Sequence, residues 1–212
     1  MQNKQLYDLT ANISASLVVY PGDPSFSKEQ IYSLDTGEKF NLCQMHLGNH
    51  AGTHVDFPCH TVKGGKSSSA FPLEYLTGPR VIIKVPSDSP SITKDFVSQQ
   101  SIMKNDIVFF KTENSKKSKH ESFIDQYVYI EADAAEELYK KGAKIVGIDY
   151  ISVDKYDDEE LSVHNLLLSK EILIVEGLEL KDIPEGRYEI FIMPLKVDDL
   201  DGLPARVAAR AC

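Results

Sequence analysis

The sequence predicts an α/β fold, a single domain with a mixed central β-sheet, on three observations. The 212 residues suffice for one domain with a sizeable core and do not require two, so residues 1–212 are expected to form one unit. Apolar residues make up 42% of the chain and charged residues 26%, which is the balance of a folded globular protein. Short apolar runs alternate with helix-like segments through the second half of the chain, as in α/β domains.

The expected strands are short apolar runs, rich in β-branched and aromatic residues and bounded by turn-forming residues. Residues 80–85 and 106–111 are the best candidates for central strands. Residues 40–50 are compatible with a strand that would carry His46 and His50 on one face. Further runs of strand length cover residues 6–9, 145–148, 172–175 and 189–193.

Three short helices and a rigid turn complete the expected elements. Thr93 is a good N-cap for the first helix, and Gly142 is a natural C-terminal stop for the second. The YPGDP sequence of residues 20–24 is dense in residues that restrict the backbone or permit positive φ, so it predicts a turn. The expected helices cover residues 93–100, 133–141 and 164–169.

Charge and hydropathy exclude several classes of partner. The formal net charge of -9 would repel phosphate backbones and anionic membranes, and the one basic cluster, residues 116–120, indicates a solvated loop. No apolar run approaches the ~20 residues that span a bilayer. Three sparse cysteines and the absence of a secretory-type N-terminus fit a reducing compartment. We therefore expect a cytoplasmic protein with no nucleic-acid or membrane partner.

The stretch HAGTHVDFPCH, residues 50–60, concentrates three of the six histidines of the chain. Zinc and similar ions take imidazole nitrogens and carboxylate oxygens, and a catalytic site uses about three protein ligands. His54 and Asp56, two apart in an extended segment, project to one side, and Gly52 lets the backbone turn so that His50 converges on them. These three side chains are the predicted metal ligands.

His60 is predicted to do acid/base work beside the metal. Pro58 holds the turn stiff and carries His60 to the rim of the pocket, where a histidine of near-neutral pKa could shuttle a proton. The alternative is that these histidines only satisfy hydrogen bonds in loops or in the core. This explanation is weaker here, because three histidines and an aspartate occur together at the spacing of metal ligands. His46 is expected to have a structural or supporting use, and Cys59 to be an inert packed thiol.

The motif HxGTHxDxP, followed two residues later by His60, resembles that of the cyclase family of metal-dependent hydrolases, whose best-defined members are bacterial kynurenine formamidases. The likeness runs nearly end to end. It continues in residues 19–24, 71–74, 78–81, 147–154, 164–167, 176–178, 194–196 and 201–206.

The resemblance implies a swivelling β/β/α fold and a site for one or two divalent ions. His50, His54 and Asp56 would hold one ion, and Asp56 would bridge to a second ion completed by His164 and Glu176. On the residues alone, His164 would be taken for a helix-face histidine and Glu176 for a solvated strand end. Zinc is the ion expected first and manganese the alternative. Members of the family are usually dimers or tetramers, so a homodimer or homotetramer is expected.

The resemblance also implies hydrolysis of an amide or formamide C–N bond by a metal-activated water, with His60 as proton donor and acceptor. The small-molecule substrate could be N-formylkynurenine, which would make the protein an arylformamidase. Alternatives are a cyclic-amide (isatin-type) hydrolase and a metal-binding module without turnover. Kynurenine formamidases usually begin the YPGDP turn with Trp, which the family uses to stack on an aromatic substrate, whereas this chain has Tyr20 and no Trp. Tyr20 can still stack, but the substrate is left open.

Overall fold

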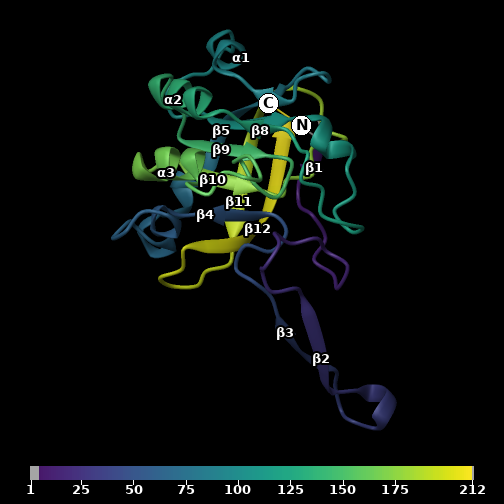
Figure 1. Ribbon diagram of the computed structural model, residues 1–212. Coiled ribbons are helices and arrows are strands. Elements are labelled where there is room, and N and C mark those ends of the chain that lie inside the picture. The colour runs from purple at the N-terminus through teal and green to yellow at the C-terminus, as the bar shows by residue number, and fades with distance from the viewer. Residues whose placement is uncertain (1–4, 212) are drawn as a thin grey trace.

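The computed structural model describes residues 5–211, and its centre is a mixed β-barrel. Within these residues, eight strands follow the order β1-β12-β11-β5-β7-β9-β10-β4, and β4 also pairs with β12 (Figure 1). Seven strands therefore close on themselves, with β1 attached outside. The strands are β1 (Leu6–Asp8), β4 (His54–Asp56), β5 (Thr77–Lys84), β7 (Ile107–Lys111), β9 (Ile145–Ile148), β10 (Leu173–Glu176), β11 (Gly186–Pro194) and β12 (Gly202–Ala211).

The barrel combines a parallel and an antiparallel half. Strands β5, β7, β9 and β10 run parallel in that order, while β11, β12 and β4 complete the circle with antiparallel pairings. The predicted α/β fold with a mixed sheet is confirmed, and both segments expected to be central strands are neighbours in its parallel half. Closure of the sheet into a barrel was not predicted.

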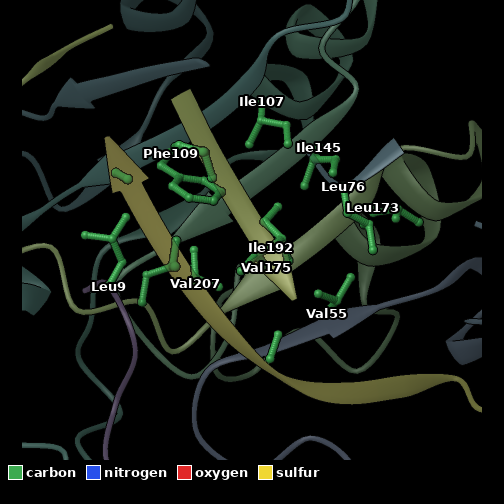
Figure 2. Packing of buried hydrophobic residues seen from close by; sticks show 14 of the residues in the cluster. Leu9, Val55, Leu76, Ile107, Phe109, Ile145, Leu173, Val175, Ile192 and Val207 are labelled. Carbon is green, nitrogen blue, oxygen red and sulfur yellow. The ribbon is translucent and has the colours of Figure 1, made fainter. Parts of the chain in front are cut away.

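Successive side chains of the parallel strands point alternately to two hydrophobic cores. One core fills the barrel interior (Figure 2) and includes Leu9, Phe109, Ile145, Val175, Ile192 and Val207. The other lies between the outer face of the barrel and its helices, and includes Phe110, Val146, Ile174, Leu138 and Leu167. Burial on both faces explains why these strands have almost continuously apolar sequences.

Three α-helices lie where helices were expected: α1 (Lys94–Ser98), α2 (Ala132–Lys140) and α3 (Ser162–Ser169). The Thr93 side chain accepts a hydrogen bond from the backbone N–H of Phe96 at 3.2 Å, as an N-cap does. Gly142 follows α2 with a φ of 78°, a conformation that favours glycine. The helix α3 begins two residues earlier than expected, because Asp154 accepts hydrogen bonds from the N–H groups of Val163 and His164.

A long hairpin, which we call the arm, projects from the barrel (Figure 1). It consists of β2 (Ser27–Tyr32), a single 3-10 turn (Leu34–Thr36) and β3 (Leu42–His46), and both strands are exposed along their whole length. The strand expected over residues 40–50 is thus only partly present. The chain turns after His46, with Ala51 N–H donating to Gly48 O at 3.2 Å, so His46 and His50 do not share a strand face.

The remaining strands are two short segments, β6 (Ser91–Ile92) and β8 (Tyr129–Ile130), which pair with each other in parallel.

The basic cluster of residues 116–120 is not the fully solvated loop that was expected. Lys119 is buried, and its ammonium group contacts Glu179 Oε1 at 2.9 Å and Leu178 O at 3.1 Å. Within residues 5–211, no helix has the length and hydrophobicity to cross a membrane.

Candidate metal centre and active site

The short strand β4 places His54 and Asp56 on the outer face of the barrel, while Val55 between them joins the interior core. Because β4 is antiparallel to β10, His54 lies opposite Glu176, the last residue of that strand. His54 Nε2 is 3.3 Å from Asp56 Oδ1 and 3.4 Å from Glu176 Oε2. All three side chains are buried. Two neighbouring strands therefore bring one imidazole and two carboxylates together.

His50 reaches the same group from the loop before β4. Gly52 in this loop has a φ of 68°, so the chain doubles back there. His50 Nδ1 lies 2.8 Å from Asp56 Oδ1. On the other side of the ring, Gly202 leaves the space that the imidazole occupies, since a Cβ at position 202 would lie 2.4 Å from His50 Cε1.

His164 enters from α3. Its Nε2 lies 3.5 Å from Asp56 Oδ2 and 3.3 Å from Glu176 Oε1. Its Nδ1 is held by the carboxylate of Asp154. Glu176 Oε1 also accepts a hydrogen bond from the N–H of Val153 at 2.7 Å, so the loop after β9 fixes the glutamate as well as the histidine.

Three imidazoles share one arrangement around Asp56. Each has one nitrogen anchored to an oxygen acceptor and the other nitrogen directed at the central carboxylates. The anchors are Gly52 O for His54 Nδ1, Asp154 for His164 Nδ1 and Asp201 Oδ2 for His50 Nε2. Such anchoring of the distal nitrogen is typical of metal-binding histidines, because it fixes the ring orientation and leaves a lone pair for the ion.

The centre also contains buried polar atoms that need a partner. His54 Nε2 and both carboxylate oxygens of Asp56 are fully buried and have no hydrogen-bond partner within residues 5–211. Their contacts at 2.8 to 3.5 Å are ion-pair contacts between the histidines and the carboxylates of this group. Two groups of donor atoms that all lie within 4.8 Å of one another share Asp56: His54, Asp56 and Glu176, and His50, Asp56 and His60. Imidazole and carboxylate donors in this arrangement fit a divalent cation.

The electrostatics of the group reflect its dense packing. Burial lowers the pKa of His54, but the negative charges of Asp56 and Glu176 outweigh burial and raise that pKa to about 10. Burial raises the pKa of Asp56, whereas the positive charge of His54 and the contacts with His164 and His50 lower it well below its usual range. The buried carboxylate is thus ionised and stabilised by cationic neighbours, the role that a divalent cation also fills.

His60 lies beside this group at the end of a 3-10 turn (Pro58–His60). Its Nδ1 is 3.2 Å from Asp201 Oδ2, and its ring packs on that of His50 with a centroid distance of 4.2 Å. The two rings face a pocket of about 190 Å³ that is open to solvent. The pocket is lined by Tyr20, Asp23, His50, His54, His60, Ile151, Ser152, Leu161, His164 and Glu176.

Tyr20 lies on the pocket wall, at the start of the turn expected over residues 20–24. The turn is present, with Asp23 N–H donating to Tyr20 O at 3.0 Å. The Tyr20 ring contacts Phe123 edge-on at a centroid distance of 5.8 Å, and its hydroxyl donates to Tyr156 O at 3.3 Å. Phe123 in turn packs on Tyr156 at 5.1 Å. Tyr20, which lines the pocket, is therefore supported from behind by two further aromatic rings.

The structure brings Tyr20, His50, His54, Asp56, His60, His164 and Glu176 to one place, although they were singled out from distant parts of the sequence. Two other residues lie elsewhere. His46 is on the arm, where its Nε2 is 3.1 Å from Gln44 Nε2, so of the two uses expected for it, structural or supporting, the structure does not place it in support of the centre. Cys59 is half-buried, and its thiol points toward Leu200 O at 3.8 Å.

Sequence reasoning missed the roles of two acids, Asp154 and Asp201. Both stand in segments that carry the family resemblance, residues 147–154 and 201–206, which is the one signal that could have drawn attention to them. Their partners cannot be read from the sequence, because Asp201 meets His50 across 151 positions of the chain.

Comparison with known proteins agrees with this geometry. Residues 7–155 match the family described as "Putative cyclase". The chain is 33% identical over 206 residues to "Kynurenine formamidase" of Salinibacter ruber, with 97% of each chain covered. It also superposes on the solved structure of a "predicted metal-dependent hydrolase from Bacillus stearothermophilus" with a TM-score of 0.86 and 33% identity, over 99% of both chains.

A more distant structure shows the same fold. Isatin hydrolase A from Ralstonia solanacearum gives a TM-score of 0.86 at 24% identity, with 99% of this chain and 93% of that chain covered. The resemblance noted for residues 50–60 is thereby confirmed over most of the chain. A family match that spans residues 7–155 and a relative 33% identical over nearly its whole length show that this chain belongs to the cyclase family.

Proposed function

We propose that this protein is a metal-dependent hydrolase that cleaves an amide or formamide C–N bond. The observation that carries the proposal is the convergence of four histidines and two carboxylates at Asp56 and on the rim of a solvent-accessible pocket. The similarity to a kynurenine formamidase over nearly the full chain and to a metal-dependent hydrolase structure supports the reaction class. The enzyme would need no covalent intermediate.

We assign the binding of the ion to His50, His54, Asp56, His164 and Glu176, with Asp56 shared between two positions. A divalent cation held by these residues would supply Lewis acidity to water and to the substrate carbonyl. Zinc is the ion we propose first, because imidazole nitrogens and carboxylate oxygens are its usual ligands, and manganese is the alternative. Whether one ion or two bind is decided by elemental analysis of protein purified without added metal.

We assign proton transfer to His60. Its position at the pocket rim lets it reach a reacting group, and half-burial leaves it accessible to solvent. A neutral imidazole that takes a proton from the attacking water can return it to the departing nitrogen, which completes hydrolysis. Tyr20 is the proposed contact for an aromatic ring of the substrate, because it lines the pocket and is held there by Phe123.

The substrate we propose first is an N-formyl arylamine such as N-formylkynurenine. The specific support is a curated kynurenine formamidase at 33% identity, whereas the isatin hydrolase likeness lies below 25% and reaches only the fold. Zinc-loaded and manganese-loaded protein is assayed with N-formylkynurenine, isatin and a further cyclic amide. Release of formate with a kcat/KM at least tenfold above that for isatin is expected. Faster ring opening of isatin would instead show that the protein is a cyclic-amide hydrolase.

His60→Ala separates an enzyme from a binding module. We expect the variant to keep its metal and to lose amide hydrolysis by about 10²- to 10⁴-fold, the usual contribution of a general acid/base. His46→Ala on the exposed arm is the control and should retain full activity. If His60→Ala loses its metal, His60 is itself a ligand. Its position close to His50 and Asp56 would then account for the loss. Metal-loaded wild-type protein without any hydrolysis would establish a module without turnover.

We further propose that the protein is a homodimer or homotetramer in which the arm is covered by another copy. A two-stranded hairpin alone is marginally stable in water, yet this arm is exposed along its length and carries several large apolar side chains. They are Ile31, Tyr32, Leu34, Phe40, Leu42 and Met45, each at least 41% exposed. The sparse cysteines support a cytoplasmic location, and the one sheet built from strands of both ends of the chain supports one domain for residues 1–212.

The arm is tested by replacing Phe40 and Met45 with Ser. The double variant should shift from dimer or tetramer to monomer in light scattering coupled to size-exclusion chromatography, because both side chains lose their apolar contact with the second copy. Replacing the exposed Lys28 and Lys39 of the same hairpin with Ser is the matched control and should leave the assembly intact. A wild-type protein that is monomeric at micromolar concentration would contradict the proposal.

A further inference from the structure

The carboxylate of Asp201 contacts two functional histidines through a single oxygen. Its Oδ2 lies 3.0 Å from His50 Nε2 and 3.2 Å from His60 Nδ1. Its other oxygen, Oδ1, accepts a hydrogen bond from the Asn49 side-chain amide at 2.8 Å. The backbone of Asp201 is fixed as well, because its carbonyl accepts from the N–H of Phe57 at 2.8 Å, immediately before the turn that carries His60. Asp201 is therefore held in place between the two rings.

We propose that Asp201 is a positioning residue that sets the tautomers of His50 and His60 together. This inference rests on the proposed hydrolase function for its catalytic consequence, and it concerns the metal-loaded protein, in which a metal-binding imidazole is neutral. An ionised carboxylate can only accept hydrogen bonds, so each ring nitrogen that faces it carries the proton. A neutral imidazole has one N–H, so the opposite nitrogen then has a free lone pair.

The consequence differs between the two rings. In the metal-loaded protein, His50 would carry its single proton on Nε2 and leave the lone pair of Nδ1, which lies 2.8 Å from Asp56 Oδ1, free to bind the ion. His60 is protonated on Nδ1, so its basic atom is Nε2. The first ring is thereby prepared to bind a cation and the second to accept a proton, and one carboxylate oxygen determines both.

The arrangement is specific to this pair of histidines. His54 is anchored by Gly52 O and His164 by Asp154, so neither depends on Asp201. Gly202, the next residue after Asp201, leaves room for the His50 ring, which would collide with any Cβ there. Loss of the Asp201 charge should therefore disturb two of the four rings and leave the other two in place.

Asp201→Asn tests this directly. The amide is isosteric, but it lacks the charge and has one acceptor oxygen, whereas the carboxylate uses Oδ2 for both histidines and Oδ1 for Asn49, so the amide cannot accept from all three donors at once. Asp198→Asn, on the same loop but exposed and outside the pocket, is the matched control. The readout is long-range ¹H–¹⁵N NMR of zinc-loaded protein labelled with ¹⁵N-histidine, which reports which ring nitrogen carries the proton.

Wild-type protein is expected to show the Nε2–H form for His50 and the Nδ1–H form for His60. In Asp201→Asn, His60 should populate both tautomers and the His50 signals should shift, while those of His54 and His164 stay unchanged. kcat should fall about 10- to 100-fold, the usual effect of removing a carboxylate behind a functional histidine, with KM within twofold. Asp198→Asn should match wild type in every measurement.

Two results would overturn the inference: an Nε2–H tautomer of His60 in the wild type, or unchanged His50 and His60 signals in Asp201→Asn. Because the spectra do not depend on turnover, failure of the proposed hydrolase function is distinguishable. Wild-type protein with the expected tautomers and no amide hydrolysis would contradict the proposed hydrolase function. It would still support the role of Asp201 in setting the two tautomers.

Discussion

Asp56→Asn is expected to leave the protein without its divalent cation and to lower kcat/KM for amide hydrolysis by about 10³-fold or more. Asp56 is fully buried and belongs to both groups of candidate ligand atoms. Asparagine removes the charge at the shared position and turns an N–H₂ group toward the imidazoles. Elemental analysis after extensive dialysis measures the bound metal, and initial rates measure the activity.

The matched control for Asp56→Asn is Asp149→Asn. Asp149 is also fully buried, but it is held by Thr112 and Ser115 in a separate network. Its replacement should lower the stability of the protein without changing the metal content of the folded fraction. Full metal content in Asp56→Asn would show that Asp56 is not the shared ligand.

Gly177→Ala is expected to lower the free energy of unfolding of the metal-free protein by about 3 kcal/mol, and its Tm by about 9 °C. Gly177 follows the proposed ligand Glu176 and has a φ of 67°, which costs a residue with a Cβ about 1 to 2 kcal/mol. A Cβ there would lie 2.2 Å from Gly52 O, a backbone atom that cannot rotate away. The loop that carries His50 must therefore shift, so metal affinity should fall as well.

Gly64→Ala isolates the two contributions. Gly64 has a similar φ of 76°, but a Cβ there would meet nothing within 4 Å, so only the backbone cost remains. We expect this control to lose about 1 kcal/mol and to keep wild-type metal affinity. Thermal and denaturant unfolding measure both variants. Equal losses in the two variants would mean that the approach of Gly177 to Gly52 is looser than it is in the structure.

The strands and helices that were predicted correctly are those with strong local signals. The segments around Phe109 and Val146 are apolar on both faces because they separate two cores, and continuous hydrophobicity reveals that directly. Closure of the barrel has no comparable signal. It depends on β12, whose Gly202, Pro204 and Arg206 are poor indicators of a strand, pairing with a three-residue strand about 150 positions earlier.

The residues of the candidate site also differ in whether the sequence alone could predict their positions. The convergence of His50, His54 and Asp56 could be expected from spacing, since alternation along a strand and a glycine turn are local properties. His164 and Glu176 were reached only through the family resemblance, because each is a single residue in an apolar segment. The contacts of Asp154 and Asp201 required coordinates. Charged residues are common on loops, and only the fold shows which histidine each one meets.

The position of β4 in the barrel has a consequence for synthesis of the protein on the ribosome. Strand β4 pairs with β10 on one side and β12 on the other, and these strands are made about 120 and 150 residues later. A nascent chain that ends before β12 has His54 and Asp56 but neither their second neighbouring strand nor the carboxylate of Asp201. The proposed ligands can therefore assume their final geometry only when nearly all of the chain has emerged, so we expect the metal to bind after translation.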